Sequence, residues 1–385
     1  MTNDLEIPPA LGEATAPPAR RIGGWLADGL VATLPAWLAG HLIVCLVSWH
    51  IHRKHPLAAL FEWDTKWYRM IAAFGYDHAG VLVHFFPLTS FTAAGISTIT
   101  RIPVTFALFG FVWLMALVFG ALVHRLVIRE TGDRGAARRA AWLTQLAPGG
   151  YALVMAYTEP LAGALAVAYF LAVRSYSDRP PRLWVAAAVG FLSGMARPTG
   201  LLLAIPGMIE GLRLARGSGW RPALVAKTVA VTAAPIAGLV AFLGYSKYRY
   251  DSWMLPFQEQ TVKTNRAAII NSPKHSLHII WYDTPHGHQV ATMIALVLVL
   301  SVALLPILAG KLPVSYLAWT VPMYILGITS QKFTSMPRYI GALFPLLIVA
   351  ALISRRIWQE VIVIAVGAAL LLWTTQITLH GWLVA

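Results

Sequence analysis

The stretch FEWDTKWYRMIAAFGYDH, residues 61–78, sets acidic, basic and aromatic side chains close together between two apolar segments. Asp64 has the clearest chemistry in it, because a carboxylate beside aromatic walls can accept a proton from an attacking hydroxyl. Partial removal from water raises the pKa of such a group toward the working range of a base. The plainer alternative is that Asp64 caps a helix and accepts hydrogen bonds from free amides of its first turn. The two roles are compatible, since a cap also fixes the carboxylate.

The spacing of apolar side chains around Asp64 predicts a short helix at the membrane surface. Five such side chains fall on one stripe: Trp63, Trp67, Met70, Ile71 and Phe74. Lys66 and Arg69 then face polar surroundings, and Gly75 ends the helix. We expect Trp63, Trp67 and Tyr68 to anchor it at the lipid surface.

The chain that holds this stretch is that of an all-α, polytopic membrane protein. It is 58% hydrophobic and 12% charged, with several apolar runs near the roughly 20 residues that span a bilayer. We expect about eleven spans, within a range of about ten to twelve. They lie near 25–49, 103–128, 140–156, 160–174, 183–196, 199–210, 224–246, 289–309, 312–329, 339–354 and 360–380.

Basic residues set the predicted topology. Residues 1–24 form a disordered cytoplasmic tail, and residues 25–385 form a single membrane domain. The short pair around Arg197-Pro198 is either two helices or one kinked helix, because proline disturbs a helix. Two helices place more than half of the 30 Lys and Arg residues inside, as the positive-inside rule favours. That choice leaves two long outer loops, 50–102 and 247–288, which carry interfacial helices.

The outer loops also hold most of the histidines, and this gathers polar chemistry on one face. Nine of the 12 histidines lie there: His50, His52, His55, His78, His84, His275, His278, His286 and His288. Solvated or phosphate-contacting imidazoles are the default interpretation, and a divalent metal, though compatible with the spacing, is not indicated. No cofactor is expected. The single Cys45 excludes an internal disulfide framework, and neither nucleotide-binding glycine motif is present.

Five segments resemble the motifs of the PIG-V type mannosyltransferases, in order along residues 61–347. After FEWDTKWYRMIAAFGYDH with FFPL come LAPGGYALVMAYTEPL (146–161), GFLSGMARPTGLLL (190–203), YRYDSWMLPFQEQ (248–260) and SMPRYIGALFPL (335–346). The chain departs from the family at Thr89-Ser90, where Tyr-Pro is usual, and at Tyr250-Asp251-Ser252, which matches Gly-Asp-Pro loosely.

This resemblance implies a C-type (GT-C) glycosyltransferase. Such enzymes move a sugar, here mannose, from a polyprenyl-phosphate donor to an acceptor hydroxyl on the non-cytosolic face, with inversion. An acidic residue of the first outer loop is their usual base, which corresponds to Asp64. The competing classes are a transporter or flippase of lipids or lipid-linked sugars, and a non-catalytic binder of a lipid-linked sugar. The absence of an internal repeat argues against the transporter.

Three basic residues are candidates to bind the donor phosphate: Arg338, Arg197 and Lys332. Arginine offers a fork of donors that matches phosphate oxygens, and a departing phosphate needs charge stabilisation. The alternatives are a structural role for Arg197 beside Pro198, and snorkelling of Arg338 and Lys332 at the interface.

Further residues are candidates to contact the substrates. Glu159 either starts a helix, holds an acceptor hydroxyl or orients Arg197. Tyr157 and Tyr339 are expected to be cavity walls. The other candidates for substrate contact are His84, Trp63, Trp67 and Tyr68.

The expected partners are the lipid donor, an acceptor lipid, glycan or protein, and the bilayer, but no nucleic acid. The chain looks most like bacterial relatives, which places it in the plasma membrane with a cytoplasmic N-terminus and an outer active face. A eukaryotic member would lie in the endoplasmic reticulum.

Overall fold

The computed structural model describes residues 22–55, 58–77, 82–174, 182–258, 277–278, 280–282, 286–328, 335–341 and 343–382, and every regular element in them is a helix. Five helices are long and apolar enough to cross a membrane, with α1 counted from Leu26. They are α1 (Ile22–Ile51), α4 (Val104–Thr131), α10 (Pro222–Tyr250), α13 (Gly287–Lys311) and α17 (Ile357–Leu379). The prediction of an all-α integral membrane protein is confirmed.

The other predicted apolar segments coincide with shorter helices. These are α5 (Arg134–Leu146), α6 (Tyr151–Val154), α7 (Glu159–Val173), α8 (Leu183–Ala196), η3 (Pro198–Leu203), α9 (Ala204–Gly217), α14 (Val314–Ile328), α15 (Met336–Gly341) and α16 (Phe344–Ile353). Two predicted spans are broken near prolines: Pro148 lies between α5 and α6, and Pro345 follows the start of α16. The first outer loop holds η1 (Ala58–Phe61), α2 (Asp64–Phe74) and α3 (Pro87–Thr100), of which α3 was not predicted.

The segment around Pro198 forms two antiparallel helices. Leu183, at the start of α8, and Leu214, near the end of α9, line the same pocket. One kinked helix would separate these residues by most of its length, about 45 Å at 1.5 Å per residue. The two-helix alternative is therefore the one found.

Some predicted features fall outside the described residues. These are residues 1–21 of the tail, His78, most of the second outer loop including His275, and Lys332. The first helix begins at Ile22, three residues before the predicted span.

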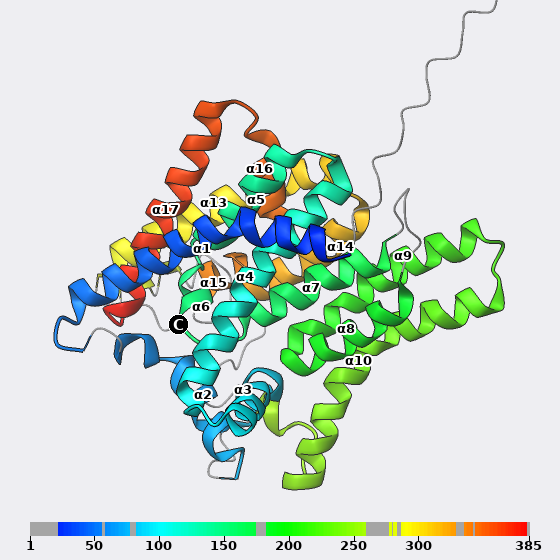
Figure 1. Ribbon diagram of the computed structural model, residues 1–385, viewed down its shortest axis with the longest axis horizontal. Coiled ribbons are helices and arrows are strands. Elements are labelled where there is room, and N and C mark those ends of the chain that lie inside the picture. The colour runs from blue at the N-terminus through cyan, green and yellow to red at the C-terminus, as the bar shows by residue number, and fades with distance from the viewer. Residues whose placement is uncertain are drawn as a thin grey trace, which may run out of the picture.

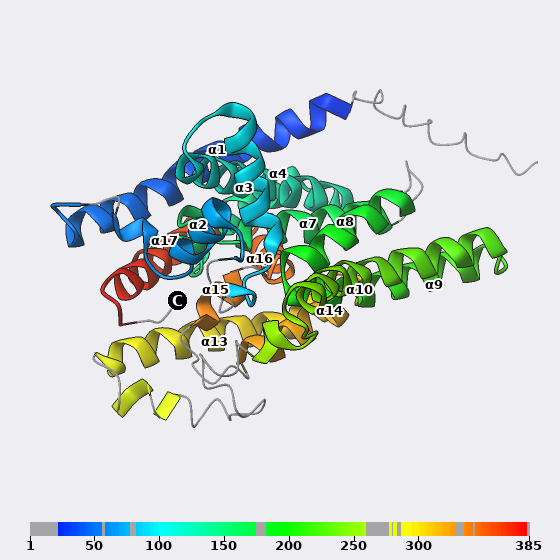
Figure 2. The ribbon, with the colours of Figure 1, turned by 90° about the horizontal axis from the view of Figure 1, so that it is seen from below.

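Helix α4 is central to the packing, with contacts to α1, α3, α5 and α7. Figure 2 shows α1 along one side of the molecule and α13 along the other, with α4, α7 and α17 between them. Helices α2 and α3 contact each other and lie beside the last turns of α10 at the bottom of Figure 1. The first outer loop thus covers one end of the bundle.

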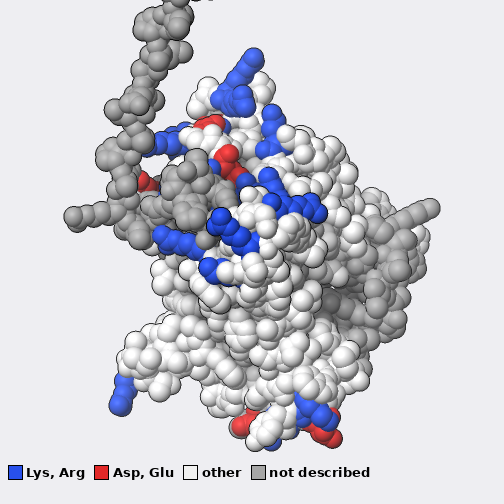
Figure 3. Space-filling view, turned by 90° about the vertical axis from the view of Figure 1, so that its right-hand side faces the viewer, with Lys and Arg blue, Asp and Glu red and all other residues white. Residues whose placement is uncertain are grey.

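Charged side chains are unevenly placed on the surface. On the face drawn in Figure 3, Lys and Arg side chains gather in the upper half and a few charged groups lie at the bottom edge. The zone between them is uncharged on this face, as a segment in contact with lipid requires.

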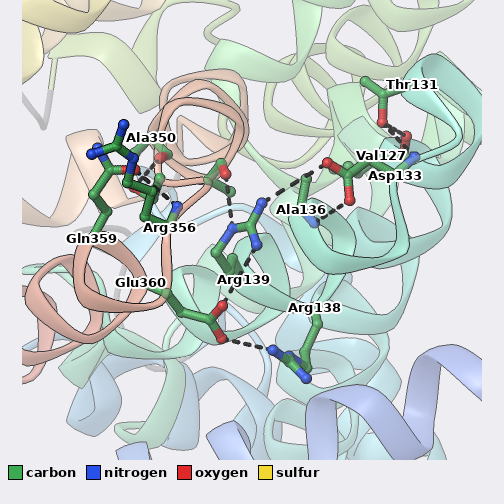
Figure 4. A network of polar contacts seen from close by, with 12 residues as sticks. Val127, Thr131, Asp133, Ala136, Arg138, Arg139, Ala350, Arg356, Gln359 and Glu360 are labelled. Carbon is green, nitrogen blue, oxygen red and sulfur yellow. Dashed lines mark hydrogen bonds and ion pairs between the residues drawn. The ribbon is translucent and has the colours of Figure 1, made fainter.

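Arg139, a buried arginine of α5, binds residues of α16 and α17 (Figure 4). Nε of Arg139 donates to the carbonyl oxygen of Ala351 at 3.0 Å, and its Nη1 lies 3.5 Å from Oε2 of Glu360. Only 8% of the Arg139 side chain is exposed, whereas 56% of Arg138, which binds the other oxygen of Glu360, is exposed. A buried guanidinium needs such partners, because an uncompensated buried charge is costly.

A second buried network joins α4, α7, α9 and α14. Arg174 makes two hydrogen bonds to the carboxylate of Glu130, at 2.6 and 3.0 Å, and one to Glu210 at 2.8 Å. Tyr316 and Ser315 of α14 donate to these two carboxylates. Four helices are therefore fixed around one guanidinium.

We expect Arg139→Ala to lower the free energy of unfolding by about 3 kcal/mol, because it leaves Glu360 and the end of α16 without their buried partner. The matched change Arg138→Ala removes an exposed partner of the same glutamate and should cost under about 1 kcal/mol. Denaturant unfolding of the purified protein in detergent measures both. Equal losses would contradict the importance of burial here.

Candidate active site

Four charged side chains from four elements meet beneath the first outer loop. Nη1 of Arg338 (α15) lies 2.5 Å from Oδ2 of Asp64 (α2), and its Nε lies 3.1 Å from Oε1 of Glu159 (α7). Nη1 of Arg197, the residue after α8, lies 2.8 Å from the same oxygen of Glu159. Two carboxylates and two guanidinium groups form one chain of contacts with no net formal charge. We call these four residues the charged cluster.

The two carboxylates differ in exposure. The side chain of Asp64 is 22% exposed and that of Glu159 is 5% exposed. Burial raises the pKa of Asp64 above that of a solvated aspartate, and the neighbouring guanidinium of Arg338 opposes this rise. Asp64 is thus the carboxylate of the cluster that a ligand can reach, and it has one cationic partner where Glu159 has two.

The start of α2 aims Asp64 into the cluster. Trp63 is the N-cap residue of the helix, and its backbone has a positive φ of 56° with ψ of −134°. Such a conformation is strained for a bulky residue. It is held in part by the indole Nε1, which donates to the carbonyl oxygen of Thr378 at 3.2 Å. Asp64 therefore does not act as the cap, and its carboxylate binds Arg338 instead of amides of the first turn.

The buried face of α2 also differs from the predicted stripe. Phe74 is 59% exposed, whereas Thr65, Tyr68, Ile71 and Ala72 are buried. The helix ends at Gly75, as predicted, with φ of 67°. Tyr68 faces the protein and packs edge-on against Phe85 at 5.2 Å, because α2 is covered by the segment that leads into α3. Burial raises the pKa of Tyr68, which keeps its phenol neutral.

Glycine packing sets the position of Arg338. A Cβ atom on Gly149 would lie 2.4 Å from the carbonyl oxygen of Pro337 and 2.6 Å from Cα of Arg338. A Cβ atom on Gly341, on the other side of Arg338, would lie 3.0 Å from Cα of Gly149. The segment between α5 and α6 can therefore press against α15 only where a side chain is absent. This role was not predicted from the sequence, although two adjacent glycines, Gly149 and Gly150, are typical of a close backbone contact.

Arg197 and Arg338 are partners in buried ion pairs. Two of the alternatives for Glu159 are found together, since it is the first residue of α7 and it also binds Arg197. Snorkelling of Arg338 is wrong, since its side chain is 8% exposed and bound to two carboxylates. The alternative that Arg197 only satisfies carbonyl groups freed by Pro198 is replaced by its ion pair with Glu159.

Tyrosine rings line the cationic side of the cluster. Cζ of Arg338 lies 5.1 Å from the ring centre of Tyr157 and 5.4 Å from that of Tyr339. Cζ of Arg197 lies 5.5 Å from the ring centre of the same Tyr339. Cation–π contacts of this kind help to hold a guanidinium group. The hydroxyl of Tyr157 is buried and has no hydrogen-bond partner within the described part of the chain.

Thr89 and Ser90, where Tyr-Pro is usual in the PIG-V type pattern, form hydrogen bonds to residues next to the charged cluster. Oγ1 of Thr89 lies 2.8 Å from Oγ1 of Thr158, the neighbour of Glu159. Oγ of Ser90 donates to the carbonyl oxygen of Tyr68 at 2.9 Å. Both bonds join α3 to elements of the cluster, the start of α7 and α2.

The remaining candidate residues lie around this centre. The ring of Trp67 is half-buried beside Nζ of Lys66, at 5.1 Å, and the ring of His84 packs against Phe85 at 4.2 Å. Tyr250, of the fourth quoted segment, donates to the carbonyl oxygen of Tyr76 at 3.0 Å, and so packs on the turn after α2. In the part of the chain that the structure describes, no three His, Cys, Asp or Glu residues are grouped to hold a metal ion.

We expect Glu159→Gln to lower the free energy of unfolding by about 3–5 kcal/mol, because it leaves two buried guanidinium groups with one carboxylate. Glu62→Gln, an exposed acid near Asp64, is the matched control and should change stability by less than about 0.5 kcal/mol. Unfolding in detergent, followed by tryptophan fluorescence, compares the two. A loss no larger for Glu159→Gln than for its control would show that the cluster does not need this carboxylate.

No family model and no curated protein sequence matches this chain. Among solved structures, it is similar to the oligosaccharyltransferase of Archaeoglobus fulgidus, crystallised in complex with Zn and sulfate, with 12% identity and a TM-score of 0.48. The match covers 88% of this chain and 53% of that one, so the chain spans about half of its length.

Proposed function

We propose that this protein is a membrane-embedded inverting glycosyltransferase of the GT-C kind, which transfers a sugar, mannose by the sequence resemblance, from a polyprenyl-phosphate donor. The observation that carries the proposal is the charged cluster itself. A partly exposed carboxylate, the expected place for a base, lies 2.5 Å from a buried arginine, the expected place for a phosphate. The segments that provide both residues are segments through which the sequence resembles the mannosyltransferase family.

Asp64 is the proposed general base. Its carboxylate is the more exposed of the two, and its raised pKa suits proton uptake better than that of a fully solvated aspartate. Glu159 is the less suitable candidate because both arginines bind it and its side chain is buried. Its proposed role is to hold Arg197 and Arg338 in place.

Arg338 and Arg197 are proposed to bind the donor phosphate. A guanidinium group has five N–H donors. Among the described residues, Nη1 of Arg338 and Nη1 of Arg197 donate hydrogen bonds to carboxylates of the cluster, whereas Nε of Arg338 lies 3.1 Å from Glu159 without a hydrogen bond. The N–H groups that these hydrogen bonds do not use are proposed to bind phosphate oxygens. Lys332, which lies outside the described residues, is a third proposed ligand. Tyr157, Tyr339, Trp63, Trp67, Tyr68 and His84 are proposed to contact the sugar or the acceptor.

The proposed reaction is a single displacement at the anomeric carbon. Asp64 removes the proton of the acceptor hydroxyl, whose oxygen forms a bond to the anomeric carbon of the sugar. The bond between that carbon and the phosphate oxygen breaks on the opposite face, and its electron pair leaves with the polyprenyl phosphate. The arginines stabilise the charge on the departing phosphate. Holding both substrates at one membrane surface orients them for this displacement.

We expect Asp64→Asn to lower turnover of polyprenyl-phosphate mannose with a panel of membrane acceptors by about 10²–10⁴-fold, the usual contribution of a general base. Donor binding should persist, because the arginines remain. Glu62→Gln serves again as the control and should retain activity. Full turnover by Asp64→Asn would remove the assignment of the base, and no turnover of wild type with any acceptor would favour a transporter or a binding protein.

We expect kcat/KM to rise with pH as Asp64 loses its proton, since only the carboxylate form accepts a proton. Because burial raises the pKa of Asp64, the midpoint of this rise should lie above about 3.9, the value of a solvated aspartate. A pH profile of the wild type, with folding checked at each pH, measures it. A midpoint at or below the pKa of a solvated aspartate would contradict the prediction. So would the same rise of kcat/KM with pH in the residual activity of Asp64→Asn.

A further inference from the structure

A pocket of about 490 Å³ lies at the end of α8 away from the charged cluster. Its walls come from the start of α8, the end of α9 and the start of α10, at Arg182, Leu183, Trp184, Val185, Leu214, Leu224 and Lys227. Arg197 follows the last residue of α8 and Arg182 precedes its first. Since α8 has 14 residues, the pocket and the cluster are about 20 Å apart along the helix axis. The pocket is therefore separate from the candidate active site. Helix α10, which is long and apolar enough to cross a membrane, starts at the pocket and ends at Tyr250, which packs on the turn after α2, so we place the pocket toward the membrane face opposite the first outer loop.

The charged side chains that line this pocket, within the described residues, are basic. Arg182 and Lys227 line it, and no acidic residue does among the part of the chain described. The acid that α9 carries, Glu210, is already bound by Arg174 and Arg213. Lys227 is half-buried in the second turn of α10, a helix apolar enough to span the membrane. A cation at such a position requires a counter-ion or water.

The walls of the pocket are partly apolar and partly cationic, which favours an amphiphilic ligand with an anionic group. Leu183, Leu214 and Leu224 supply an apolar surface, and Val185 continues it to the outside with 48% exposure. Trp184 is 69% exposed at the rim, as expected for an indole at the boundary of membrane and water. Around these helix ends, Figure 3 shows Lys and Arg side chains in the upper half of the face. Free phosphate would use the cations alone, whereas an amphiphile would use the apolar walls as well.

We propose that this pocket binds the headgroup of an anionic phospholipid from the membrane leaflet opposite the charged cluster. The phosphodiester lies between Arg182 and Lys227, and the acyl chains leave along Val185 and Leu224 into the bilayer. The N-termini of α8 and α10 add partial positive charge near the phosphate. Basic pockets between membrane helices recognise anionic headgroups by the same combination. The proposal does not depend on the reaction proposed above.

Native mass spectrometry of the delipidated full-length protein in detergent tests the proposal, with phosphatidylglycerol and phosphatidylcholine titrated separately. We expect phosphatidylglycerol to bind preferentially and the double variant Arg182→Gln/Lys227→Gln to bind it on the order of tenfold more weakly. The matched control is Arg216→Gln/Arg221→Gln, which removes the same charge from the adjoining end of α9 and start of α10, at residues outside the pocket lining. Its affinity should stay within about twofold of the wild type.

Three results would overturn the proposal. The first is equal affinity of the wild type and the pocket variant for phosphatidylglycerol. The second is binding of phosphatidylcholine as tight as that of phosphatidylglycerol, or displacement of the lipid by millimolar inorganic phosphate. The third is a preference for polyprenyl phosphate over phosphatidylglycerol. Lys227→Arg, which keeps the charge, should retain binding, and its thermal unfolding beside that of the double variant separates lost binding from lost folding.

Discussion

The double ion pair of Arg338 is the interaction on which the candidate site depends. A guanidinium group that is 8% exposed must be neutralised within the protein, and here two carboxylates from α2 and α7 do so. Because Glu159 also binds Arg197, the requirement extends to the end of α8. One buried cation thus fixes the relative positions of the elements that frame the site, and Gly149 lets α15 come near enough for this to happen.

Acidic residues are scarce in this chain, 16 against 30 Lys and Arg residues. Several of them act as counter-ions to arginines buried between helices: Asp64, Glu130, Glu159, Glu210 and Glu360. Buried pairs of this kind add little stability when compared with apolar packing, but breaking one is costly. They therefore specify which helix ends meet. The surplus of cations is left at the surface and in the pocket beside Lys227, where a membrane can supply the negative charge.

Apolar runs were sufficient to predict the five long apolar helices, since the length and hydropathy of a span depend on local sequence, whereas α3 and the breaks near Pro148 and Pro345 were not predicted. The end of α2 at Gly75 was predicted because glycine readily adopts the positive φ that ends a helix. The face that α2 buries was not, because Tyr68 and Ala72 are covered by the segment before α3, which is a tertiary contact. Within the site, Asp64, Glu159, Arg197 and Arg338 were all singled out. Their pairing was only partly foreseen, since residues up to 274 positions apart meet there.

The neutrality of the charged cluster has a consequence for the proposed reaction. Before proton transfer, the charge of Arg338 is shared with Asp64 and Glu159. When Asp64 takes the proton of the acceptor hydroxyl, it loses its charge and Arg338 loses one of its two counter-ions. At the same moment the phosphate becomes more negative as its bond to the sugar breaks. The same guanidinium is then less compensated when the leaving group needs it most, so that one contact couples the base to the departure of the phosphate.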